Sequence, residues 1–119
     1  MKSTPECPAE RAIYFLGGKW KIRIVFLLYQ NKKNRFGEIK KWLTTITQQM
    51  LSKQLKELEI DGLIYRKVYQ VVPPKVEYSL TEFGNSVIPI LKSFSDWNKK
   101  NSRIISSKLN KNFEESRIR

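Results

Sequence analysis

The chain has 119 residues, 40% of them hydrophobic, which is enough for one domain with a buried core. Its 23 lysine and arginine residues outnumber 11 aspartate and glutamate residues, and the resulting charge of +12 favours a polyanionic partner. The chain has no histidine and a single cysteine, which excludes a His-assisted nucleophile, a closed zinc site within one chain and an intrachain disulfide. The N-terminus lacks the apolar stretch of a signal peptide, and the longest apolar run, Ile24 to Tyr29, is too short to span a bilayer. We therefore expect a cytoplasmic protein that does not contact the membrane and binds no cofactor.

Helices are predicted in the first half of the chain. One begins after Pro8 and ends at Gly17-Gly18, because glycine accepts the conformation that closes a helix. The second runs from Lys19 to Tyr29, followed by a polar connector over residues 31–34 and a short helix from about Phe36 to Leu43. The apolar stripes of these two helices are Trp20, Ile24, Leu27 and Leu28, and then Phe36, Ile39, Trp42 and Leu43.

The next helix is predicted to begin at Thr47, which caps its N-terminus, and to run to about Ile60, where Asp61-Gly62 stops it. Its buried face has a leucine every three or four residues: Leu51, Leu55 and Leu58. The opposite face carries the polar side chains Gln49, Ser52, Lys53 and Lys56.

The pattern then changes to that of a β-hairpin. Leu63 to Val72 is rich in β-branched and aromatic residues, and Pro73-Pro74 marks a loop. Lys75 to Leu80 alternates between polar and apolar residues, which predicts a half-buried strand with Lys75, Glu77 and Ser79 facing solvent.

A final long helix is predicted to follow Thr81, its cap, with Glu82 in the first turn and a kink at Pro89. Its apolar stripe is Phe83, Val87, Ile90, Leu91, Phe94 and Trp97. After Asn98 an amphipathic helix would continue through Ile104, Ile105, Leu109 and Phe113, and residues 114–119 are expected to fray. These apolar surfaces indicate a dimer interface, or packing of the terminal helices back onto their own domain.

The order of elements predicts an α+β, mainly helical fold: a winged helix-turn-helix with a two-stranded β wing and terminal dimerisation helices, as one domain over residues 1–119. Residues 31–75 carry ten basic and four acidic side chains, half of the net excess. A helix in this position fits the major groove of DNA, where glutamine bonds adenine and lysine reaches guanine. The candidate groove contacts are Thr47, Gln48, Gln49, Ser52, Lys53 and Lys56. Candidate phosphate or minor-groove contacts are Arg66, Lys67 and Lys75 of the wing, with Lys32, Lys33 and Arg35 before the short helix. An ordinary solvated surface is the alternative.

Together these stretches resemble the HxlR-type winged-helix transcriptional regulators, relatives of the MarR regulators. The similarity covers roughly residues 7–98 and leaves residues 99–119 as a helical extension and frayed tail. The stretches that carry it are Cys7-Pro8, Gly17 to Lys21, Arg35 to Ile39, Thr47 to Glu59, Asp61 to Ile64, Val72 to Thr81, and Gly84. It implies a homodimer that binds duplex DNA, with Ile13, Leu91, Phe94 and Trp97 as candidate interface residues. One departure is Gln49, where the family pattern more often has lysine, so the preferred base sequence stays open.

Cys7 is a candidate redox or electrophile sensor, because the resemblance implies a cysteine sensor here and a helix N-terminus favours the thiolate. The alternative is a small apolar residue without a signalling role. The sequence leaves two other functions to compare with regulation of transcription. A winged domain can also bind an acidic protein or RNA. An enzyme is disfavoured, because the pairs Glu57 with Lys53 and Glu82 with its neighbours resemble helix support rather than acid–base chemistry.

Overall fold

The structure is a computed structural model that describes residues 7–118, with side chains described for residues 7–111. The chain forms two compact units, one ending at Ile88 and one beginning at Pro89. Among the described residues, no helix combines the length and hydrophobicity needed to cross a membrane.

Four helices make the body of the first unit: α1 (Pro8–Tyr14), α2 (Lys21–Asn31), α3 (Phe36–Leu43) and α4 (Gln48–Ile60). Helix α3 has the predicted bounds, and α4 ends where glycine was expected to stop it, with Gly62 at a φ of +80°. Helix α1 is shorter than predicted and ends at Tyr14. After it the chain closes in a 3₁₀-type turn, in which the Leu16 N–H donates to the carbonyl of Ile13, three residues earlier, at 2.9 Å. Helix α2 is shifted two residues toward the C-terminus.

The core of this unit consists of side chains that are at most 2% exposed: Ile24, Val25, Leu28, Ile39, Ile46, Leu51, Leu55, Leu58, Leu63 and Ile64. The predicted stripes of α2 and α4 supply half of them. The stripe predicted for α3 was wrong at Trp42, which is 67% exposed near the C-terminal end of that helix.

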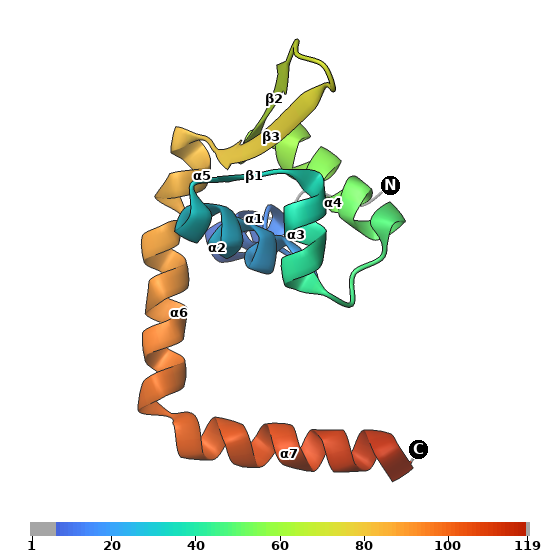
Figure 1. Cartoon of the computed structure of the whole chain (residues 1–119). Coiled ribbons are helices and arrows are strands. Elements are labelled where there is room, and N and C mark those ends of the chain that lie inside the picture. Colours follow the sequence, from blue (N-terminus) through green and yellow to red (C-terminus); the bar gives the residue numbers. More distant parts are fainter. Residues whose placement is uncertain (1–6, 119) are drawn as a thin grey trace, which may run out of the picture. The chain divides into compact units, whose positions relative to one another are not determined.

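A three-stranded antiparallel sheet contains one strand more than predicted. Its strands are β1 (Lys33–Asn34), β2 (Ile64–Tyr69) and β3 (Lys75–Leu80), in the order β1-β3-β2 (Figure 1). The hairpin of β2 and β3, called the wing below, projects beyond the helices (Figure 1). Strand β1 was missed because two residues inside a polar connector show no periodicity.

Strand β3 has the predicted bounds but not the predicted exposure. Because it is the central strand, its polar face has neighbouring side chains on both sides: Lys33 of β1, and Lys67 and Tyr69 of β2. Glu77, expected to face solvent, is only 9% exposed, and Lys75 and Ser79 are half-buried.

The predicted long final helix is broken. Helix α5 (Glu82–Ser86) is capped by Thr81, whose Oγ1 accepts the Gly84 N–H at 2.9 Å, and α6 (Ile88–Lys100) begins after Val87. Pro89 lies in the first turn of α6, where a backbone N–H would have no partner within the helix, so the missing N–H of proline costs no hydrogen bond. Pro89 therefore follows a break between two helices and does not kink one helix.

The second unit continues from α6 into α7 (Ser102–Ile118). Helix α7 reaches Ile118, and Arg119 lies outside the described residues. Fraying of residues 114–119 stays a prediction.

Candidate nucleic-acid interface

Helix α4 is fixed at its N-terminus, along its buried face and at its side. The Thr47 hydroxyl accepts the Met50 N–H at 3.1 Å, which confirms the predicted cap. The three leucines are at most 2% exposed. The carboxylate of Glu57 forms an ion pair at 3.0 Å with Lys21 of α2, not with Lys53 as the spacing suggested. Helix α4 is therefore anchored in the core by its leucine face and paired with α2 through Glu57, and Lys53 remains on the exposed face.

The outer face of α4 presents every candidate groove contact to solvent. These exposed residues are Thr47, Gln48, Gln49, Ser52, Lys53 and Lys56. The first four line one surface hollow at the N-terminal end of the helix. Backbone N–H groups of a first helical turn lack partners within the helix, so this end combines donors with amide and hydroxyl side chains.

The wing does not present its three candidate cations to one side. Residues Lys67 and Glu77 are direct partners in the register, as are Tyr69 and Lys75, and Lys33 of β1 pairs with Ser79. Side chains alternate along a strand, so Lys33, Lys67 and Lys75 share one face of the sheet, called the basic face below. Arg66 pairs with Tyr78 and belongs to the opposite face.

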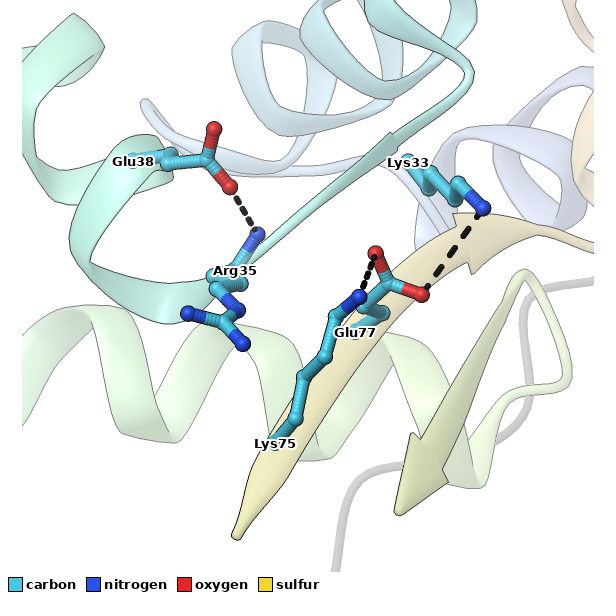
Figure 2. Close-up of polar contacts among 5 residues, drawn as sticks. All are labelled: Lys33, Arg35, Glu38, Lys75 and Glu77. Atoms are coloured by element: carbon cyan, nitrogen blue, oxygen red, sulfur yellow. Dashed lines mark hydrogen bonds and ion pairs between the residues drawn. The ribbon is translucent and has the colours of Figure 1, made fainter. Parts of the chain in front are cut away.

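Glu77 lies in the middle of the basic face (Figure 2). Its Oε1 is 3.9 Å from Lys33 Nζ and its Oε2 is 3.6 Å from Lys75 Nζ. Among the described residues, Oε1 is buried without a hydrogen-bond partner. Hydrogen bonding from Tyr69, with the charges of both lysines, lowers the pKa of Glu77, although desolvation opposes this. The group is therefore a carboxylate at neutral pH.

The ring of Tyr69 contributes to the same cluster. The Nζ atoms of Lys67 and Lys75 lie 4.8 Å and 5.0 Å from its centroid, within the range of cation–π attraction. Hydrogen bonding to Glu77 raises the pKa of Tyr69, so its hydroxyl stays protonated. Sequence reasoning did not assign Tyr69 or Glu77 to the site. Its one available signal was an acidic residue between basic ones on a strand.

Arg35 directly follows β1 and precedes α3. Its backbone N–H donates to the Glu38 Oε1 at 2.8 Å, which caps α3, and its side chain is exposed (Figure 2). In sequence, Lys33 of β1 and Arg35 at the cap of α3 flank Asn34, which is buried at 5% exposure.

Cys7 is exposed and precedes α1 as its N-cap residue. The nearby backbone N–H groups of Glu10 and Ala9, at the start of α1, lower the pKa of the thiol by favouring its thiolate. A larger fraction of this thiol is thus ionised near neutral pH than in an unstructured peptide.

The candidate interface residues differ in exposure. Ile13 of α1 is 59% exposed, and Phe94 and Trp97 of α6 are 58% and 62% exposed. Leu91 is 2% exposed and so is already covered in the single chain. Helix α7 adds Ile104 and Leu109, which are 62% and 50% exposed.

Comparison with known proteins agrees with this arrangement. The model of the family described as HxlR-like helix-turn-helix matches residues 15–106. The chain is 51% identical over 94 residues to a Bacillus subtilis protein named as the uncharacterized HTH-type transcriptional regulator YdeP, covering 79% of this chain and 73% of YdeP. It is 46% identical over 101 residues to the regulator BH0655 of Halalkalibacterium halodurans, covering 85% and 89%.

Solved structures give the same result. The redox regulator HypR in its reduced form matches with a TM-score of 0.80 and 44% identity, covering 85% of this chain and 99% of HypR. The reduced form of the transcriptional regulator YodB from B. subtilis matches with a TM-score of 0.72 and 34% identity, covering 81% and 94%. The mainly helical winged fold is the one predicted. The chain belongs to the HxlR-like helix-turn-helix family of transcriptional regulators.

Proposed function

We propose that the protein binds duplex DNA sequence-specifically as a homodimer, with α4 in the major groove and the wing on the adjacent backbone or minor groove. The observation that carries the proposal is the outer face of α4: six exposed polar residues between the N-cap and Lys56 of a helix whose opposite face is buried, in the most basic part of the chain. Amide and ammonium side chains are the groups that recognise base edges.

The proposal assigns different roles to two lysines. Lys53 of α4 contacts a base, whereas Lys75 of the basic face contacts phosphate. Lys53→Ala therefore reduces discrimination between the preferred duplex and a single-base variant by about tenfold. Lys75→Ala weakens binding to all duplexes equally and lowers the slope of log affinity against log salt by about 0.9 per protomer.

Fluorescence anisotropy with labelled duplexes over a range of salt concentrations measures both effects. Lys99→Ala in α6 removes the same charge outside the proposed contacts and serves as the control. Wild-type affinity and selectivity in both Lys53→Ala and Lys75→Ala would contradict the assignment. Stronger binding to single-stranded RNA than to duplex DNA would favour an RNA-binding function instead.

The proposed dimer is supported by exposed apolar residues on the terminal helices. Ile13, Phe94 and Trp97 are retained as proposed contacts, because exposed apolar side chains of this kind are often covered in stable oligomers. Leu91 is left out, since a buried side chain does not reach a partner.

Redox control through Cys7 is a second proposed property. It is supported by the exposure of the thiol, its lowered pKa, and the matches to HypR in reduced and oxidised forms and to diamide-treated YodB. With one cysteine per chain, two protomers would form a disulfide by giving two protons and two electrons to an oxidant such as diamide. We expect diamide to change the duplex affinity of the wild type but not that of Cys7→Ser. If the binding titrations of both proteins are identical with and without diamide, redox control through Cys7 is refuted.

A further inference from the structure

The basic face has a buried acid at its centre. The side chain of Glu77 is 11% exposed, whereas those of Lys33 and Lys75, with which it pairs, are 62% and 35% exposed. The ammonium groups of Lys33 and Lys75 flank the Glu77 carboxylate on two sides (Figure 2), and both lysine side chains are more exposed than the carboxylate they pair with.

The carboxylate changes the charge that this face offers to a polyanion. Lys33, Lys67 and Lys75 together carry three positive charges, and Glu77 cancels one of them. Burial of a carboxylate is unfavourable unless cations and hydrogen bonds compensate it, and here two lysines and Tyr69 do so. Its negative charge is therefore a fixed property of the folded wing.

We propose that Glu77 determines specificity by acting as an internal counter-ion, which weakens the sequence-independent attraction of the wing for phosphate. A DNA phosphate that approaches Lys33 or Lys75 competes with Glu77 for the same ammonium group. Base contacts from α4 then account for a larger share of the binding free energy. This inference rests on the proposed function.

The size of the effect follows from the geometry. Lys75 Nζ is 3.6 Å from Oε2 of Glu77, and a phosphate oxygen would approach the other side of the ammonium group to about 3 Å. The phosphate and the carboxylate are then about 6–7 Å apart. In a medium as polar as water, their repulsion corresponds to about a threefold change in Kd per wing.

The test compares wild type, Glu77→Gln and Glu77→Asp on a random-sequence duplex between about 50 and 200 mM salt. Glu77→Gln has the same shape without the charge and binds about threefold more tightly per wing, with the difference shrinking as salt rises. Glu77→Asp keeps the charge and shows no such gain. Glu10→Gln removes the same charge from the exposed helix α1 and leaves the affinity unchanged.

Binding by folded Glu77→Gln that is equal to or weaker than wild type would overturn the proposal, as would an equal gain in Glu10→Gln. A purely structural role for Glu77 predicts lower stability together with weaker binding, whereas the counter-ion role predicts lower stability with tighter binding. If Glu77→Gln does not fold, the duplex affinities of Lys33→Gln and Lys67→Gln are compared instead. Lys33 forms an ion pair with Glu77, so Lys33→Gln is expected to lose less affinity than Lys67→Gln. Equal losses of affinity in the two variants would overturn the proposal. Absence of wild-type binding would refute the proposed function itself.

Discussion

Replacing Thr81 with alanine removes a hydroxyl group that links three segments of the first unit. The Oγ1 atom donates to the Gly62 carbonyl at 2.6 Å, after α4, and accepts the Gly84 N–H at 2.9 Å, in α5. Loss of an N-cap costs about 1 kcal/mol, and loss of the second hydrogen bond about 1 kcal/mol more. The expected loss of unfolding free energy is therefore about 2 kcal/mol. For a chain of 119 residues this corresponds to a fall in Tm of about 8 °C.

Thr81→Ser is the matched control, because serine keeps the hydroxyl and loses only a methyl group. Thermal unfolding followed by circular dichroism, together with urea titration, gives both values. We expect Thr81→Ser to lose less than half as much stability as Thr81→Ala. Equal losses in the two variants, or wild-type stability in Thr81→Ala, would show that the hydroxyl does not hold the end of β3 to α4 and α5.

Three further predictions concern packing, pH and assembly. Gly84→Ala places a methyl group against the backbone carbonyl of Leu63 and costs about 3 kcal/mol, measured by urea unfolding. Gly37→Ala in α3 meets open space and is neutral or stabilising by up to about 1 kcal/mol. The lowered pKa of Glu77 means that its charge stabilises the fold above the ordinary value of 4.5. The stability difference between wild type and Glu77→Gln should therefore disappear as pH falls below 4.5 toward the folded pKa, and a constant difference would contradict the assignment. Trp97→Asp introduces a charge into the proposed interface and shifts the sedimentation equilibrium from dimer toward monomer, whereas an unchanged mass would exclude Trp97 from the interface.

Local signals with a clear physical cause were enough to predict the parts of the fold that carry α4. Thr47 and Gly62 mark its ends because a hydroxyl side chain satisfies free N–H groups and glycine accepts a positive φ. The leucine spacing of α4 identified its buried face, and alternation identified β3. Each of these depends on residues close together in sequence.

The features that were missed depend on tertiary contacts. Strand β1 forms only because β3 is adjacent, and Glu77 is buried only because β3 becomes the central strand. The alternation of polar and apolar residues distinguished the two faces of β3, but it did not show how far each face is buried. For Trp42 the three-residue spacing was correct for a helix stripe, yet the stripe extends beyond the core at the end of α3.

The candidate site was predictable in composition but not in arrangement. The exposed face of α4 follows directly from helical periodicity. Alternation along β2 alone places Arg66 and Lys67 on opposite faces of the wing. Placing Lys75 on the same face as Lys67 requires the register between β2 and β3, which sequence spacing does not determine across a loop of this length.

Selection of bound sequences from a random duplex pool tests the central claim most directly, since it requires neither a known operator nor a variant. A homodimer that recognises bases through α4 enriches a two-fold symmetric motif whose half-sites lie about 10 base pairs, or a multiple of that distance, apart. Enrichment of such a motif by the wild type, and its loss in Lys53→Ala, is the predicted result. Recovery of a pool no different from the starting one, despite salt-dependent binding, would show that α4 does not recognise sequence.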